Sequence, residues 1–188
     1  MLSTINFYLD GKNIALSDIS SITDCNEFRV VQYSTLYDAN DSTSLYGYHG
    51  SEHIWNANKE NHLEIKQSLK WVNSQTLDNC YMAMFPVSKT ITDTYFDDVD
   101  YDAKPISSLP IKQYKCNELN LYKTSKNVMC RFGVSKYIDE FASGGFSLIH
   151  DNGGMPYNKC YFVICQSGDI SSNTLWKTVT YYNIDISK

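Results

Sequence analysis

The stretch that decides the fold is residues 158–188, NKCYFVICQSGDISSNTLWKTVTYYNIDISK. Residues 160–165 are β-branched, aromatic or otherwise apolar on both faces, and Gly-containing turns bound them on either side. This pattern predicts a short central strand that is buried on both sides. Residues 175–186 settle into alternation and predict a second strand, so we expect the two strands to form a hairpin in the core.

This expected hairpin carries one hint of a contact surface. Successive side chains of a strand point to opposite faces, so Tyr181 and Tyr182 cannot both be buried on the same side. One of them is expected to point outward and to be available for contact. Cys160 and Cys165 face opposite ways and cannot easily pair, so we expect function to lie on the loops that the hairpin supports.

The composition disfavours several functions. The chain of 188 residues has a net charge of −5, so it offers no basic field to a nucleic acid or an anionic membrane. Only Arg29 and Arg131 are arginines, which leaves few forked donors for phosphate recognition. Aromatic residues make up 14%, with fifteen Tyr, and favour half-buried strands and adhesive surfaces. An AT-rich genome would produce the same bias.

The six cysteines include no Cys-x-x-Cys pair, so a zinc ribbon is not expected. The first residues, Met1 to Asn6, lack a basic region and a long apolar run, and predict no secretory signal. We therefore expect reduced, mostly buried thiols, no membrane-spanning segment, and a location in a host cytoplasm or a virion.

Short apolar runs along the rest of the chain predict further strands. Asp10-Gly11 separates two β-prone runs and is the strongest hairpin signal in the sequence. Other strands are expected at residues 28–33, at residues 80–85 before Pro86, and at residues 119–122, 128–132 and 146–149. Eight to ten strands at such separations predict a mainly β fold, an antiparallel sandwich or jelly-roll-like arrangement in one domain, residues 1–188.

One or two short helices and two long loops complete this expectation. Residues 58–73 place Ile65, Leu69 and Val72 at helical spacing, although residues 62–66 also alternate as a strand does. Residues 136–142 favour a second helix that ends before Gly144-Gly145. Loops are expected at two places, residues 37–50 and the acidic residues 89–113, which we interpret as a long surface excursion.

Two clusters suggest a metal. His49 and His53 are four residues apart with His62 nine further on, but Gly47 and Gly50 argue against the helix that would align them. Residues 97–102 carry alternate carboxylates, of which Asp98, Asp100 and Asp102 fit the first positions of a calcium loop. The sixth and twelfth positions, Ala103 and Leu109, do not fit, so exposed histidines and a solvated acidic loop are the simpler interpretations.

The stretch Tyr48-His49-Gly50-Ser51 resembles the His-Gly-Ser/Thr segment of the ADP-ribosyltransferase family, over four residues of 188. The resemblance implies that the strand-borne His and its neighbour would hold the nicotinamide ribose of NAD. It also implies a later Tyr and a catalytic Glu, for which Glu118 and Glu140 are nominations without a motif. A turn that uses Gly50 explains the same residues.

The sequence favours a non-enzymatic interaction protein over these alternatives. Its composition is similar to that of a virion or bacteriophage component, which predicts other protein subunits as partners, an oligomer or larger assembly, no nucleic acid, no membrane and no cofactor. A carbohydrate-binding module with Tyr or Trp55 stacked on sugar rings is the third hypothesis. The expected contact residues are Tyr37, Tyr46, Tyr48, Trp55, Tyr95, Phe96 and Tyr101.

Overall fold

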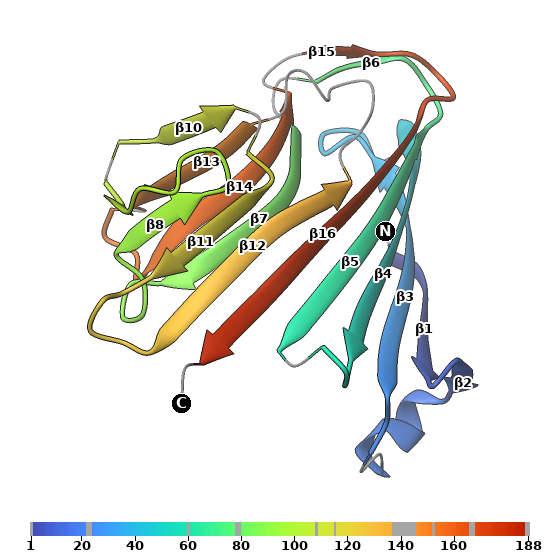
Figure 1. The fold of residues 1–188 in the computed structure, drawn as a ribbon. Helices are drawn as coiled ribbons and strands as arrows, with labels where there is room; N and C mark the ends of the chain where they lie inside the picture. The colour runs from blue at the N-terminus through green and yellow to red at the C-terminus, as the bar shows by residue number, and fades with distance from the viewer. Residues whose placement is uncertain are drawn as a thin grey trace. The chain divides into compact units, whose positions relative to one another are not determined.

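The computed structural model describes residues 2–21, 24–59, 61–77, 80–107, 109–114, 116–136, 146–151, 153–165 and 168–186 (Figure 1). These residues form antiparallel strands and one short 3-10 helix, which confirms a mainly β fold with few helices. They pack into two compact units, Met1–Thr76 with Asp169–Val179, and Leu77–Gly168 with Thr180–Lys188. The single domain expected over residues 1–188 stays a prediction.

The first unit is built on one sheet. Its elements are β1 Leu2–Leu9, β2 Lys12–Ile14, the 3-10 helix η1 Leu16–Ser21, β3 Glu27–Tyr37, β4 Leu45–Asn56, β5 His62–Trp71, and the first part of β16 Leu175–Ile186. The strand order is β2-β1-β3-β4-β5-β16. Asp10 and Gly11 take positive φ angles of 47° and 80° between β1 and β2, so the predicted Asp-Gly hairpin is confirmed.

The expected helix at residues 58–73 is wrong, because most of these residues form β5. Leu63 and Ile65 pair with Trp55 and His53 of β4 in regular antiparallel register, while Glu64 and Lys66 lie on the opposite face. The alternation within residues 62–66 was therefore the correct signal, and the helical spacing of Leu69 and Val72 was accidental.

The loop expected at residues 37–50 is also shorter than its composition suggested. β3 extends to Tyr37 and β4 begins at Leu45, so Tyr46, Tyr48 and Gly50 are strand residues. A strand can form here despite the polar residues of β4, because successive side chains alternate between the two faces of an antiparallel sheet and one face can be solvated.

The second unit is a sandwich of two sheets. Its strands are β7 Cys80–Ser88, β8 Thr94–Asp97, β9 Lys104–Pro105, β10 Ile111–Tyr114, β11 Glu118–Tyr122, β12 Val128–Lys136, β13 Phe146–Asp151, β14 Tyr157–Cys165 and the later part of β16. One sheet has the order β16-β12-β11-β8-β9 and the other β10-β13-β14-β7. The short strands β6 Gln75–Leu77 and β15 Gly168–Ile170 form a separate pair.

Aromatic side chains fill the space between the two sheets of the second unit. The ring of Phe132 on β12 lies 4.7 Å from that of Phe162 on β14, 5.5 Å from Phe85 on β7 and 5.1 Å from Tyr182 on β16, measured between centroids. Phe132 and Phe162 are completely buried. Because these four rings come from both sheets, they form the core that the sandwich prediction requires.

The strands of residues 158–188 occupy different places from those expected. β14 lies between β13 and β7 and buries Cys160, Phe162 and Val163, so the predicted central strand is confirmed. β16 is a strand over residues 175–186, as predicted, but it belongs to the other sheet, so the expected hairpin is wrong. A short connection cannot distinguish a hairpin from a crossing between layers, since both leave the same alternation in the sequence.

Three further segments, around Pro86, at residues 89–113 and at residues 136–142, were predicted to be a strand end, a loop and a helix. Pro86 lies inside β7 and does not end it, which an edge strand permits because its outer N–H groups have no strand partner. The acidic segment 89–113 contains β8, β9 and much of β10. The helix expected at residues 136–142 lies outside the described residues except for Lys136, which ends β12.

The cysteines whose side chains are described carry thiols and form no disulfide. Cys116, Cys130 and Cys160 are buried, and burial raises the pKa of the Cys116 thiol to about 12. Such thiols are poor nucleophiles at neutral pH. Among the described residues, no helix has the length and apolar character needed to cross a membrane.

Removing the ring at the centre of the sandwich is expected to weaken the second unit strongly. Phe132→Ala should lower the free energy of unfolding by about 3–5 kcal/mol, because it leaves a cavity among three aromatic neighbours. Tyr33→Ala, at an exposed position of β3, is the control and should change it by less than about 0.5 kcal/mol. Urea denaturation measures both, and equal losses would contradict this account of the core.

Candidate functional site

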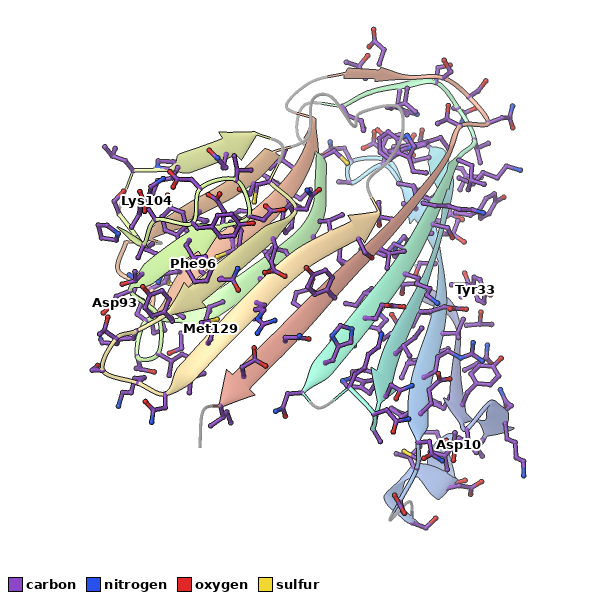
Figure 2. The ribbon with its side chains drawn as sticks, in the orientation of Figure 1. Asp10, Tyr33, Asp93, Phe96, Lys104 and Met129 are labelled. Carbon is purple, nitrogen blue, oxygen red and sulfur yellow. The ribbon has the colours of Figure 1, made fainter. Side chains whose placement is uncertain are left out.

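The candidate site lies on the outer face of the β16-β12-β11-β8 sheet of the second unit. We call it the outer-face pocket, an open depression of about 520 Å³. Its lining residues are Phe96, Asp98, Tyr101, Asn117, Glu118, Asn120, Met129, Arg131 and Tyr181. Figure 2 shows Phe96 on β8 and Met129 on β12, two of these residues. The pocket combines aromatic, amide and charged side chains, as small-molecule sites usually do.

Strand alternation explains why these side chains share one face. On β11, Leu119 and Leu121 are completely buried on the sandwich side, so Glu118 and Asn120 face outward. The register then places Asn120 directly between its cross-strand partners, Phe96 of β8 and Arg131 of β12. An aromatic ring, an amide and a guanidinium therefore lie side by side across three strands.

Glu118 is the best-supported polar group of the pocket. Its Oε2 accepts a hydrogen bond of 2.6 Å from the Tyr181 hydroxyl, and its Oε1 accepts one of 2.9 Å from Asn120 Nδ2. Two donors on the two oxygens fix the orientation of the carboxylate before any ligand arrives.

A glycine makes the Tyr181 contact possible. Gly133 is the cross-strand partner of Glu118 on β12, and the Tyr181 ring occupies the space where its side chain would be. A Cβ atom at this position would lie only 2.1 Å from Cζ of Tyr181. Any larger residue would displace the ring, so Gly133 is needed for the Tyr181–Glu118 hydrogen bond.

Tyr181 is held in its protonated form. Burial raises the pKa of its phenol, and the hydrogen bond to the Glu118 carboxylate raises it further. The hydroxyl therefore donates to Glu118 at neutral pH. Since Tyr182 packs against Phe85 and Phe132 in the core, the prediction that one of the two tyrosines points outward is confirmed, and Tyr181 is that residue.

The other charged groups of the pocket are already engaged. Arg131 Nη2 forms an ion pair of 2.8 Å with Asp185 Oδ2 on β16. Asp98 Oδ1 accepts hydrogen bonds from the backbone amides of Asn117 and Glu118, at 2.8 and 3.2 Å. Asp98 therefore supports the turn before β11, and Arg131 is oriented by its own carboxylate partner.

The structure brings two of the expected contact residues together and separates the others. Phe96 and Tyr101 line the outer-face pocket, and Tyr101 is 75% exposed. Tyr95 points to the other side of β8 and is 2% exposed, so the expectation that it offers a surface contact is corrected. The remaining expected residues, Tyr37, Tyr46, Tyr48 and Trp55, belong to the first unit.

Sequence reasoning missed the polar half of the pocket. Glu118 appeared only as a nomination for another activity, and Asn120 and Arg131 were not singled out. The available signal was the alternation of Leu119 and Leu121, which predicts that the residues between them share one face. Their proximity to Arg131 and Tyr181 depends on the pairing of β11, β12 and β16, which a single sequence does not specify.

The histidines of β4 are structural neighbours within the first sheet. His49 Nε2 lies 3.3 Å from Gln67 Oε1, and His53 Nε2 lies 3.3 Å from Ser51 Oγ. Gly50 lies within β4, not in the expected turn, and faces the ring of Tyr33. Within the part of the chain that is described, no three His, Cys, Asp or Glu side chains converge as metal ligands.

The acidic residues 97–102 bind backbone amides and a lysine. Asp97 is buried, and its Oδ1 accepts hydrogen bonds from the amides of Val99 and Asp100, at 2.9 and 2.7 Å. The side chain of Asp100 forms an ion pair with Lys104. This loop is therefore partly an anchored turn, which differs from the solvated loop expected from its charge.

Comparison with known proteins identifies the fold class but no family. No protein-family model matches the chain, and no curated protein matches it. The Slr1438 protein from Synechocystis sp. PCC 6803 aligns with a TM-score of 0.53 and 8% identity, over 88% of this chain and 64% of that one. A putative aldose 1-epimerase from Escherichia coli K12 aligns with a TM-score of 0.48 and 7% identity, over 88% and 68%.

The chain thus spans 64% of the length of the Slr1438 structure that it resembles. At this identity the likeness shows a shared β-rich fold alone. It gives no support for a virion, bacteriophage or assembly role, nor for ADP-ribosyl transfer or carbohydrate binding.

The Tyr181–Glu118 hydrogen bond is expected to contribute measurably to stability. In a double-mutant cycle of Tyr181→Phe and Glu118→Ala, the coupling free energy should be about 1 kcal/mol, because the acceptor is a half-buried carboxylate. A cycle of Tyr33→Phe with Glu118→Ala is the control and should show no coupling. Urea denaturation of the variants measures both, and a coupling of zero in the first cycle would contradict the geometry.

Acidification is expected to destabilise the first unit through His53. Burial, and secondly the neighbouring His49, lower the pKa of His53 below its ordinary value of 6.5. The unfolded chain therefore binds this proton more readily, so the free energy of unfolding falls as the pH drops through 6.5 towards the folded pKa. His53→Gln should remove this part of the pH dependence in urea denaturation series. An unchanged slope in the variant would show that another group is responsible.

Proposed function

We propose that the protein binds a neutral saccharide in the outer-face pocket. The observation that carries the proposal is the Glu118 carboxylate, which Tyr181 and Asn120 hold in place beside the rings of Phe96 and Tyr101. A sugar ring presents an apolar C–H face next to hydroxyl groups. Aromatic rings can stack on the apolar C–H face, and fixed carboxylate and amide groups can form hydrogen bonds with the hydroxyl groups.

The hydrogen-bonding capacity of the pocket fits hydroxyl groups in particular. Glu118 can accept further bonds, since each carboxylate oxygen has two acceptor positions and Tyr181 and Asn120 occupy one on each. Arg131 carries five N–H donors and uses one nitrogen for Asp185. Donors and acceptors at neighbouring positions are suited to adjacent hydroxyls, which both donate and accept.

The charge of the pocket favours an uncharged ligand. Asp98 and Glu118 are two carboxylates in the lining, and the one guanidinium, Arg131, is already paired with Asp185. A phosphate or a carboxylate ligand would meet these negative groups without a free cation to balance them. The sequence also contains few arginines, the residues best suited to bind a phosphate or a carboxylate, which likewise favours an uncharged ligand.

The size of the pocket suits a short saccharide. Small-molecule sites typically enclose about 300–1,000 Å³, and the volume of about 520 Å³ lies within that range. The wide exposure of Tyr101 places an aromatic ring at the rim, where a ring of the ligand can stack on it.

The test is binding of neutral mono- and oligosaccharides to the full chain, first on a glycan array and then by calorimetry with the best ligand. Tyr101→Ala should lower the affinity about tenfold, because a stacking surface is lost. Leu109→Ala is the matched control: Leu109 is also 75% exposed and does not line the pocket, so its affinity should match that of the unchanged protein.

Two results would reject the proposal. One is the failure of every neutral glycan to bind the unchanged protein. The other is binding that Tyr101→Ala and Glu118→Gln leave unaltered, which would place the ligand elsewhere on the molecule.

A further inference from the structure

The four strands β1, β3, β4 and β5 of the first unit carry all their acidic and basic residues on one face. Antiparallel partners lie on the same face, so the registers of β1, β3, β4 and β5 assign each residue to a side. The charged face carries Glu27, Arg29, Glu52, Glu64, Lys66 and Lys70, which are all the acidic and basic residues of these four strands. The opposite face of these four strands, which we call the uncharged face, contains no Asp, Glu, Lys or Arg among the described residues, and Lys12 of the edge strand β2 lies at its margin, beside Leu9.

The uncharged face is mostly apolar and aromatic. Its apolar members are Ile5, Phe7, Leu9, Phe28, Val30, Leu36, Trp55, Leu63, Ile65, Leu69 and Trp71, with Gln32, Ser34, Ser51, Gln67 and two histidines among them. At one end of the face Trp71 is buried and packs against Trp176, with the ring centroids 5.3 Å apart. The Phe28 ring lies 6.5 Å from that of Phe7 and 5.6 Å from that of Trp55, so an aromatic row crosses β1, β3 and β4.

This face remains partly open to solvent. Ile5 is 40% and Trp55 is 39% exposed, and Phe7, Phe28 and Leu63 are only half-buried. In the second unit, by contrast, the inward residues of the larger sheet, such as Leu119 and Phe132, are completely buried beneath a second sheet. A sheet with one apolar face normally buries that face against another layer.

We infer that the uncharged face is covered by the same face of a second copy of this chain, in a two-fold symmetric dimer. An isologous contact needs a surface that is complementary to itself. A face without charges meets this condition, because its copy brings no like charge against it.

The available area agrees with a modest dimer. Four strands about 4.8 Å apart and about eight residues long, at about 3.3 Å per residue, present roughly 500 Å² of sheet. Two copies would then bury about 1,000 Å², which is near the lower limit for a specific interface. Trp55 and Phe28 provide the large aromatic anchors that such interfaces use.

Two other occupants fit less well. A membrane surface would attract the face through flanking basic residues, but the chain has a net charge of −5 and its charged face carries three acidic and three basic residues. An unrelated protein would need some feature for recognition, and an uncharged face supplies no electrostatic selectivity. A second copy needs only the shape and apolar character that the face already has.

The experiment is sedimentation equilibrium of the full chain over a concentration series. We expect a monomer–dimer equilibrium with a dissociation constant on the order of 1–100 µM. Trp55→Glu should raise that constant at least tenfold, because it places a charge on each copy within the apolar contact. Tyr48→Glu is the matched control: Tyr48 lies on the same strand, is 52% exposed and faces the charged side, so its dimer should persist.

Ile5→Lys serves as a second variant on β1, in case Trp55→Glu alters the fold, and circular dichroism verifies that each variant is folded. Its dissociation constant should rise as that of Trp55→Glu does. A chain that is monomeric at about 500 µM would overturn the inference, as would a dimer that Trp55→Glu and Ile5→Lys leave intact or that Tyr48→Glu weakens equally.

Discussion

The contact between Phe132 and Phe162, whose centroids are 4.7 Å apart, is the interaction on which the second unit depends. It joins the two sheets at their centre and fixes which side of β12 faces inward. Once Phe132 points into the core, Arg131 and Gly133 must point outward, and the same holds for Glu118 and Asn120 on β11 through the register. The outer-face pocket is therefore a consequence of core packing.

The glycine at position 133 connects this packing to the chemistry of the pocket. A side chain there would occupy the space that the Tyr181 ring needs to reach Glu118. The Tyr181 hydroxyl and Asn120 then hold the carboxylate at fixed positions. A preorganised acceptor of this kind loses little conformational entropy when it binds a hydroxyl group.

The first unit shows the opposite arrangement. Strands β1, β3, β4 and β5 separate charged from uncharged residues, but the buried aromatic pair of Trp71 and Trp176 covers only one end of the uncharged face among the described residues. The exposed Trp55 and the half-buried Phe28 lie on the face that a second layer would cover in a sandwich. Strand alternation therefore has a different result in each unit. In the second unit it forms a closed core, and in the first unit it forms a face that we assign to contact with a second copy.

The amino-acid sequence by itself determined the local properties of this protein. Its alternation and turn residues predicted the β class, the Asp10-Gly11 hairpin, the central strand β14 and the outward position of one of Tyr181 and Tyr182, because each depends on neighbours in the chain. Only the tertiary structure decided that β14 and β16 lie in different sheets and that Glu118, Arg131 and Tyr181 meet in one pocket. The reason is physical: period-two patterns specify which face a side chain takes, and contacts between distant strands choose the partners of that face.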